Sequence, residues 1–184
     1  MSELEGYRIL ILATDGFEQS ELESPRDALA AAGARVEIAS PSGKAIRGWK
    51  DGDWGSEVSS DLTLDAVNAA DYDALVLPGG QINPDVLRTE AKAVELVKAF
   101  DQAGKVIAAI CHGPWLLVEA GIAKGRKVTS YKSIRTDMEN AGGLWSDEAV
   151  VTDKGMITSR SPEDLQAFNA KIIEEVKEGR HRRG

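Results

Sequence analysis

The amino-acid sequence predicts an α/β fold with a doubly wound, mostly parallel sheet sandwiched by helices. Short apolar runs of strand length alternate along the chain with longer stretches of helical period. The runs are rich in branched residues, as is typical of parallel strands that are covered on both faces. Glycine follows several of the helical stretches and marks where they end. With 184 residues, 42% of them hydrophobic, we expect one domain over residues 1–184, with an ordered core over about 6–179.

The predicted elements follow one another in β-α order. Branched apolar runs predict parallel strands, and apolar positions at intervals of three and four residues predict helices. We expect strands at 8–13, 34–39, 74–77, 106–110 and 127–130, and helices at 21–32, 89–103, 113–121 and 133–141.

The last third of the chain adds a hairpin and a final helix. Residues 150–159 alternate around Asp153-Lys-Gly155, which is a turn signal. Ser161 supplies an N-cap and Pro162 a first-turn proline for a helix that runs to about Lys177.

Composition excludes several classes of function. A formal net charge of −8 argues against nucleic acid or an anionic membrane as a partner. The basic residues 180–184 are expected to form a solvated tail. Phosphate-binding glycine loops, paired cysteines and histidine clusters are absent from the sequence, so we expect neither a cofactor nor a metal. No apolar run reaches membrane-spanning length and the amino terminus does not resemble a secretory signal, so we expect a cytoplasmic protein.

The single cysteine, Cys111, lies between the apolar run 105–110 and the helix-like stretch 112–120. A strand that turns abruptly into a helix presents the residue at the turn to unpaired backbone N–H groups, which favour a thiolate and can stabilise an oxyanion. Ala109 and Gly113 have the small-residue spacing of a nucleophile elbow. The alternative is a buried cysteine that acts as a small apolar residue. His112 follows directly and is the only histidine outside the tail.

Two other strand ends should converge on this cysteine, because ligand sites in doubly wound sheets lie beyond the carboxyl ends of the strands. The first is the acidic segment 15–21, and the second is Pro78-Gly-Gly80. Gly79 and Gly80 allow close backbone approach and could offer a further N–H group to an oxyanion, although such a sequence is often only a turn.

Four motifs, at 16–25, 73–80, 108–114 and 158–165, resemble those of the PfpI family of the ThiJ/PfpI (DJ-1/PfpI) superfamily, in the same order. The resemblance extends from Gly6 to about Gly179. It implies a flavodoxin-like sandwich of the class I glutamine amidotransferase type, assembled as a homodimer or as a hexamer built from dimers. Amidotransferase activity itself is not expected, because no His-x-Glu follows the elbow.

The resemblance also implies roles for individual residues. Cys111 matches the nucleophile and Glu21 a neighbouring glutamate, which burial and like charge would push towards its protonated form. Glu21 could instead be a first-turn carboxylate stabilised by the helix dipole. His112 matches the family histidine, which in the peptidase description is joined by an acid from a second subunit. Asp85 is the nearest match to that acid, but Asn83-Pro-Asp85 could equally begin a helix, with Asn83 as its cap.

Three further positions are weaker candidates. Trp115 could form a wall of the pocket or belong to the core. Arg160 could bind an anionic group of the substrate or an acidic neighbour. Trp49 or Trp54, in a turn-rich segment, should pack at a subunit contact or at the pocket rim.

The expected function is cofactor-independent chemistry on reactive dicarbonyls, as in the family's glyoxalase III and deglycase members. The substrate would be methylglyoxal, glyoxal or a glycated protein side chain, and Cys111 would attack its carbonyl carbon. One alternative is an intracellular cysteine peptidase that uses Cys111, His112 and Asp85. Its difficulty is that adjacent residues rarely bring a histidine ring to the preceding sulfur. Another alternative is a non-enzymatic stress protein that senses oxidants through Cys111 or acts as a chaperone.

Overall fold

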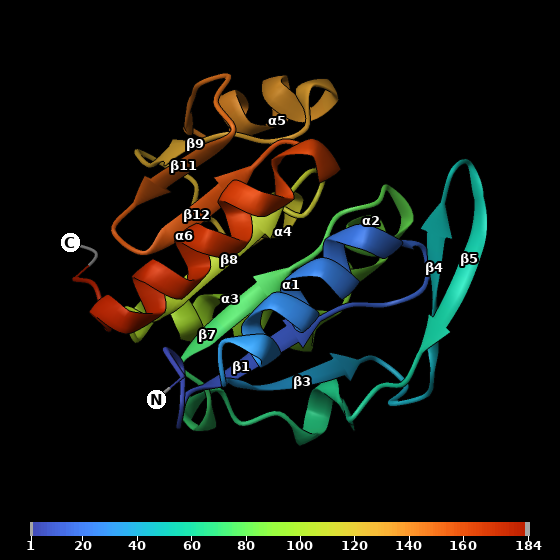
Figure 1. Cartoon of the computed structure of the whole chain (residues 1–184). Coiled ribbons are helices and arrows are strands. Elements are labelled where there is room, and N and C mark those ends of the chain that lie inside the picture. Colours follow the sequence, from blue (N-terminus) through green and yellow to red (C-terminus); the bar gives the residue numbers. More distant parts are fainter. Residues whose placement is uncertain (1, 183–184) are drawn as a thin grey trace.

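A computed structural model describes residues 2–182. Its centre is a seven-stranded sheet in the order β11-β12-β8-β7-β1-β3-β6 (Figure 1). Every neighbouring pair is parallel except β11 and β12, which form the predicted hairpin. The predicted fold class is therefore confirmed. The strands of this sheet are β1 (Arg8–Leu12), β3 (Arg35–Ser40), β6 (Leu62–Thr63), β7 (Ala74–Leu77), β8 (Val106–Ile110), β11 (Val150–Asp153) and β12 (Met156–Ser159).

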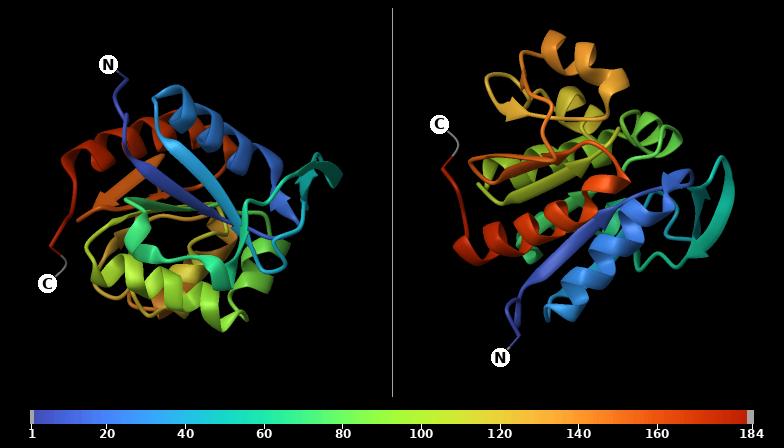
Figure 2. Two further views of the ribbon diagram at one scale, coloured as in Figure 1. Left: turned by 90° about the horizontal axis from the view of Figure 1, so that it is seen from below. Right: turned by 45° about the horizontal axis from the view of Figure 1, so that its top comes forward.

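Helices cover both faces of the sheet (Figures 1 and 2). On one face lie α1 and α6, and on the other lie α2 to α5. Alternate residues of each strand face opposite sides, so β1 sends Ile9 and Ile11 to the α1/α6 core and Leu10 and Leu12 to the α3/α4 core. The helices are α1 (Gln19–Ala31), α2 (Ile82–Leu87), α3 (Ala91–Gln102), α4 (Trp115–Glu119), α5 (Arg135–Asn140) and α6 (Leu165–Glu178), with 3-10 turns at Leu64–Ala66, Ala69–Asp71, Lys132–Ile134 and Pro162–Asp164.

The predicted strand at 127–130 is not part of the main sheet. Only β9 (Lys127–Val128) is extended, and it pairs with β10 (Leu144–Trp145) in a separate two-stranded sheet. The reason is that β12 occupies the position beside β8. The segment instead contacts β12 through a side chain, because the Thr129 amide donates to the hydroxyl of Thr158 at 2.9 Å.

A small sheet that the sequence did not predict lies beside the end of α1. It contains β2 (Phe17–Glu18), β4 (Ile46–Lys50) and β5 (Asp53–Val58) in the order β2-β4-β5. The β4–β5 hairpin projects from the body of the molecule (Figure 2). Through β2 it is attached to the acidic segment after β1, so the hairpin lies next to the carboxyl edge of the main sheet.

Arg180 and Arg182 are exposed, as expected of a solvated tail, but His181 is held against the body of the protein. The His181 amide donates to the Gly104 carbonyl at 2.7 Å, and His181 Nε2 lies 3.1 Å from a carboxylate oxygen of Glu175. These contacts dock the chain end onto α6 and the α3–β8 loop. Residues 183–184 of that expectation lie outside the described residues.

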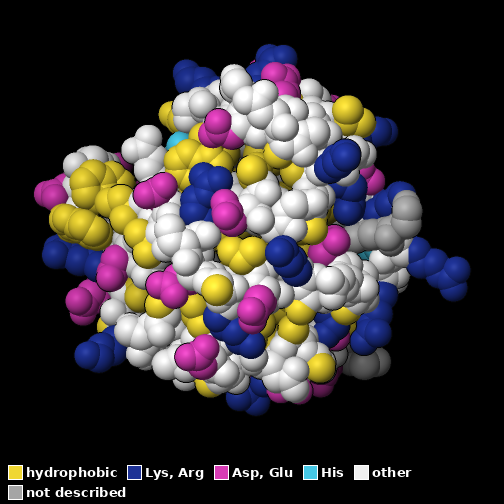
Figure 3. All heavy atoms as spheres, turned by 180° about the vertical axis from the view of Figure 1, so that it is seen from behind, with side chains coloured by type: hydrophobic (Ala, Val, Ile, Leu, Met, Phe, Trp, Pro, Cys, Tyr) yellow, Lys and Arg dark blue, Asp and Glu magenta, His cyan; other side chains and the backbone are white. Residues whose placement is uncertain are grey.

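Two surface properties bear on the partners considered above. Figure 3 shows basic and acidic side chains interspersed over one face, rather than a basic patch of the kind that binds nucleic acid. Among residues 2–182, the helices are too short or too polar to cross a bilayer.

Candidate active site

Cys111 lies directly after β8, in a strained backbone conformation. Its φ of 64° is in the left-handed region, which non-glycine residues rarely adopt. Its amide donates to the Ser159 carbonyl at 3.0 Å and its carbonyl accepts from Tyr131 at 2.8 Å. A Cβ at Gly113 would lie 2.5 Å from the Leu77 carbonyl oxygen. The turn therefore needs a glycine at this position, as the elbow spacing predicted.

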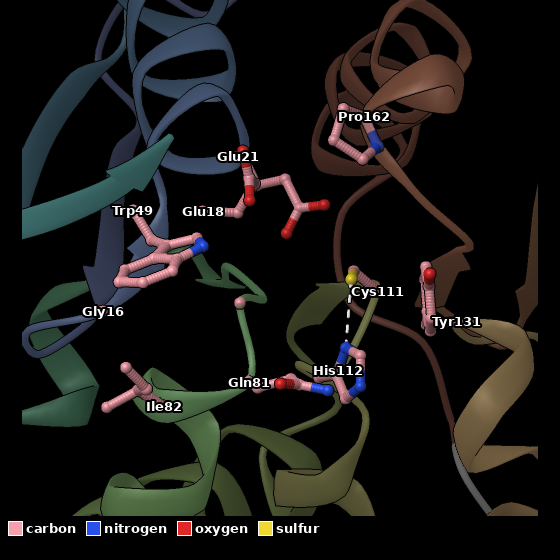
Figure 4. Close-up of a pocket in the computed structure, with 11 residues that line it drawn as sticks. Gly16, Glu18, Glu21, Trp49, Gln81, Ile82, Cys111, His112, Tyr131 and Pro162 are labelled. Carbon is pink, nitrogen blue, oxygen red and sulfur yellow. Dashed lines mark hydrogen bonds between the residues drawn. The ribbon is translucent and has the colours of Figure 1, made fainter. Parts of the chain in front are cut away.

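The strand ends converge on one pocket of about 420 Å³, shown in Figure 4. Residues after β1, β7 and β8 contribute to it, together with the small sheet and the loops before α5 and α6. The convergence of segments 15–21 and 78–80 on the cysteine is thus confirmed. The lining residues are Gly16, Glu18, Glu21, Trp49, Gly80, Gln81, Ile82, Cys111, His112, Tyr131 and Pro162.

Glu21 is completely buried in the first turn of α1. One carboxyl oxygen, Oε1, accepts a 3.0 Å hydrogen bond from the Gly79 amide, while Oε2 has no hydrogen-bond partner among residues 2–182. Burial and, secondarily, the charge of Glu18 raise the pKa of Glu21 to about 8, against the opposing effect of contacts with Gly79 and Cys111. Glu21 is therefore protonated at neutral pH and holds a transferable proton beside the sulfur.

The sulfur itself is not poised as the expected thiolate. The Cys111 side chain is buried, which raises the pKa of its thiol, and the negative charge of an ionised Glu21 raises that pKa further. The backbone amides of Gly80 and His112 oppose this rise. The Gly113 amide donates instead to the Ile110 carbonyl at 2.9 Å. Of the N–H groups expected to serve an oxyanion, those of Gly80 and His112 are the ones directed at the sulfur.

His112 contacts the sulfur that precedes it. Its Nδ1 lies 3.2 Å from Cys111 Sγ (Figure 4). The sequence-based objection that the ring would not reach the preceding sulfur is therefore wrong. Nε2 lies 3.2 Å from the Ser133 hydroxyl, and the ring stacks on Tyr131 with centroids 4.8 Å apart. Burial lowers the pKa of His112, so the ring is neutral and can accept a proton.

Four predicted residues lie outside the pocket lining. Gly79 is the first, and its amide donates to Glu21 Oε1 at 3.0 Å instead of being free for an oxyanion. Trp115 packs against the edge of the His112 ring, with centroids 5.1 Å apart, and so supports the histidine from behind. Arg160 forms a two-pronged ion pair with Asp164 and also pairs with Asp147, which is the alternative considered for it. Asp85 is exposed in the first turn of α2.

Asn83 has a role that differs from the predicted helix cap. The cap position of α2 is Gln81, and Asn83 is fully buried inside the helix. Its side-chain oxygen accepts from the Thr14 amide at 2.8 Å, and its nitrogen donates to the carbonyls of Pro78 and Gly79. Asn83 thereby holds the loops after β1 and β7 together below the pocket.

Sequence reasoning also missed several lining residues. Glu18 and Tyr131 carried a weak signal, since each lies close to a predicted strand end. Ser133 does not line the pocket but contacts His112, and no sequence signal pointed to it, because that contact depends on how the segment after β9 folds back. Trp49 does line the pocket, in agreement with the rim position considered for it, and Trp54 packs edge-on against it with centroids 5.4 Å apart.

A substitution at Gly79 should test how closely the loop after β7 packs against the carboxyl group of Glu21. A Cβ there would lie 2.5 Å from Glu21 Oε1 and 2.7 Å from Cys111 Cβ. We expect Gly79→Ala to lower kcat/KM by about 10²-fold, since a displacement of about 1 Å at reacting groups has that effect. Gly121→Ala is the control, because its positive φ strains the backbone of an alanine while the new Cβ has open space around it, so that the steric clash is confined to Gly79→Ala. Equal activity losses in the two variants would contradict the steric account.

The fold and the pocket together define a doubly wound α/β protein with a buried cysteine at a strand-to-helix turn, at the carboxyl edge of its sheet. The sequence profile of the DJ-1/PfpI family matches residues 7–175, and the chain belongs to that family. It is 44% identical, over 90% of this chain and 95% of the relative, to protein/nucleic acid deglycase 2 of Escherichia coli. YraA of Bacillus subtilis, which bears a provisional cysteine-protease name, is 40% identical over 92% of this chain and 98% of its own length.

Solved structures agree with the family assignment. The crystal structure of Drosophila melanogaster DJ-1beta superimposes with a TM-score of 0.83 and is 31% identical, covering 94% of each chain. The predicted resemblance to this family is therefore confirmed, and with it the sheet sandwiched by helices.

Proposed function

We propose that this protein is a cofactor-independent cysteine enzyme that acts on reactive dicarbonyls or on the early adducts they form with protein side chains. The observation that carries the proposal is Glu21, a fully buried carboxyl group beside Cys111 whose Oε2 has no hydrogen-bond partner among residues 2–182, and burial raises its pKa to about 8. A peptide hydrolase needs a base and an oxyanion site. In this protein Glu21 is a second proton-transferring group besides His112, and it is suited to moving a proton between carbon atoms of the substrate. The name of the Escherichia coli relative supports a deglycase-type activity.

The first step would form a hemithioacetal. As Cys111 Sγ bonds to the aldehyde carbon of methylglyoxal, the thiol proton passes to Nδ1 of the neutral His112 ring. The carbonyl oxygen gains negative charge near the amides of Gly80 and His112, and Glu21 donates its proton to that oxygen. Glu21 is then ionised and can act as a base.

The second step would be an isomerisation without an external oxidant. The Glu21 carboxylate removes the hydrogen of the former aldehyde carbon and delivers it to the neighbouring carbonyl carbon, while the hydroxyl proton moves to the second oxygen. The first carbon is oxidised and the second reduced, which leaves a lactoyl thioester on Cys111. Water cleaves the thioester, lactate and its proton leave, and the three side chains return to their starting protonation states.

A deglycase would begin from a hemithioacetal or an aminocarbinol on a protein side chain instead of the free aldehyde. Transfer of the same carbon to Cys111 releases the protein thiol or amine, and the later steps are shared. Free methylglyoxal and a methylglyoxal-treated cysteine peptide, each assayed for lactate, therefore test the proposal. Production of lactate from neither substrate would overturn it.

The pH dependence should distinguish an acid-dependent rate from a thiolate-dependent one. Because the pKa of Glu21 is raised to about 8, we expect kcat/KM to fall above about pH 8, as the free enzyme loses this proton. The acidic limb should lie below the ordinary histidine range, because burial lowers the pKa of His112. A rate of lactate formation that keeps rising to about pH 10 would instead indicate that ionisation of the buried thiol controls the reaction.

A cysteine peptidase remains a second candidate, favoured by the 3.2 Å contact between Cys111 Sγ and His112 Nδ1. In this chain the other ring nitrogen faces the Ser133 hydroxyl, and a triad would need Asp85 of a second subunit. Casein cleavage that copurifies with the protein and disappears in Cys111→Ala would support it. Suppression of aggregation that does not depend on Cys111 would support a chaperone, and stable oxidation of Cys111 without turnover would support an oxidant sensor.

We further propose a homodimer, or a hexamer built from dimers, located in the cytoplasm. Ile82 and Val86 of α2 are 40% and 38% exposed, and Asp85 lies between them in the sequence. Such apolar exposure beside the pocket is consistent with a subunit contact. Sedimentation equilibrium of the wild-type protein tests the assembly.

A further inference from the structure

A groove continues from the active-site pocket along the start of α1. Glu18 and Pro162 line both the pocket and this second hollow of about 320 Å³. Its other walls include Glu23 of α1 and Lys50 and Asp51 of the β4–β5 turn. The second hollow therefore adjoins the active-site pocket at Glu18 and Pro162, and we call it the α1 groove.

The α1 groove is acidic. Glu18, Glu23 and Asp51 face it together with a single base, Lys50. Burial raises the pKa of the half-buried Glu18, and the charge of Asp51 raises it further, so these two carboxyl groups interact electrostatically. Such an arrangement repels anions and lowers the free energy of a cation that lies between the carboxylates.

The adjoining active-site pocket also favours a cation over an anion. Among the described residues that line it, none is lysine or arginine. Glu21 Oε2 is buried without a partner. Figure 4 shows Trp49, Glu18 and Glu21 on one side of the pocket, opposite Cys111 and Tyr131. The Trp49 ring and the acidic Glu18 side chain both line this pocket, and an aromatic face beside an acidic group is a common environment for an ammonium or guanidinium group.

We propose that the pocket and the α1 groove together bind a polypeptide segment in which a basic residue lies next to the modified side chain. The adduct enters the pocket and the arginine or lysine lies in the groove, between Glu18, Glu23 and Asp51. This inference rests on the proposed function and specifies its substrate class. The two adjacent hollows, of about 420 Å³ and 320 Å³, offer more space than a free dicarbonyl fills, which favours a peptide as the occupant.

The test uses capped hexapeptides with a central cysteine flanked on both sides by arginine, serine or glutamate. Binding of the unmodified peptides to Cys111→Ala is measured by calorimetry, and lactate release from the methylglyoxal-treated peptides is measured with the wild-type protein. We expect the arginine peptide to bind about tenfold more tightly than the glutamate peptide at low salt, with most of the difference lost at about 0.5 M salt. Equal affinities for the two peptides would overturn the proposal.

Matched variants locate the effect. Glu23→Gln and Asp51→Asn should each reduce the preference for arginine by about two- to threefold. Glu95→Gln, an exposed change of the same charge on α3, is the control and should leave the preference unaltered. An equal reduction by Glu95→Gln would assign the preference to net charge and contradict the groove. Arginine preference in binding without lactate from any substrate would retain the groove and reject the proposed chemistry.

Discussion

Replacing Cys111 by alanine is expected to abolish lactate formation from methylglyoxal, with a loss in kcat/KM of at least about 10³-fold. The sulfur is the atom that bonds to substrate, and no second cysteine exists in the chain to replace it. Glu21 and the amides of Gly80 and His112 would remain, but they have no nucleophile to serve. The rate is measured by enzymatic detection of lactate at neutral pH.

Cys111→Ser provides a matched comparison, because the hydroxyl can keep a hydrogen bond to His112 while losing the nucleophilicity of sulfur. We expect this variant to be nearly as inactive as Cys111→Ala. Both should unfold within a few degrees of the wild-type protein, since the side chain is small and Cβ is retained. Substantial lactate formation by Cys111→Ala would show that the pocket acts without covalent catalysis and would refute the proposed mechanism.

Replacing Glu21 by glutamine is expected to lower kcat by at least about 10²-fold, the usual contribution of a positioned acid or base. The amide preserves the shape of the side chain and can still accept the Gly79 hydrogen bond. It cannot release a proton to the oxygen of the adduct or carry one between carbon atoms. A variant with unchanged kcat would mean that His112 alone transfers the protons.

The same variant should be more stable than the wild-type protein at alkaline pH. An unfolded Glu21 ionises near its ordinary pKa, whereas the folded one stays protonated up to about pH 8. The unfolded state therefore binds fewer protons between these values, and wild-type stability falls with rising pH across that window. Glutamine has no such dependence. Urea unfolding should show similar stabilities near pH 4.5 and a gap that widens towards pH 8.

A constant stability difference between Glu21→Gln and the wild-type protein across that window would contradict the raised pKa of Glu21. Glu95→Gln is the appropriate control, because Glu95 is exposed on α3. Its stability difference from the wild-type protein should not vary with pH in this way. The two variants together separate the ionisation of a buried carboxyl group from the loss of one negative charge.

Several parts of the fold could be predicted because their signals are local. The run 106–110 is apolar at every position, and the structure buries all five residues in β8. The turn Asp153-Lys-Gly155 has positive φ at Lys154 and Gly155, as a tight hairpin requires. Segment 127–130 had an equally local strand signal, but pairing depends on which sheet edge is free, and β12 occupies the edge beside β8.

The residues of the candidate site also fall into two groups, those that the sequence identified and those whose contacts it did not predict. Cys111, Glu21, His112 and Gly80 were identified from the sequence, and the structure places all four around one pocket. Arg160 and Trp115 were predicted to lie close to the site. In the structure Arg160 instead forms an ion pair with Asp164, and Trp115 contacts the His112 ring from outside the pocket lining. The direction of a side chain depends on the partners that compete for it, and Asp164 lies four residues from Arg160.

By itself, the sequence determined the β-α alternation of the main sheet, the small-residue turn around Cys111 and the convergence of three strand ends. Those features follow from periodicity, steric fit and the geometry of parallel sheets, which can be inferred from residues that are close together in the sequence. Only the tertiary structure decided that the thiol is buried, that Glu21 holds a proton and that Ser133 contacts His112. Protonation depends on desolvation and on charges brought together from distant segments, so no local pattern contains it.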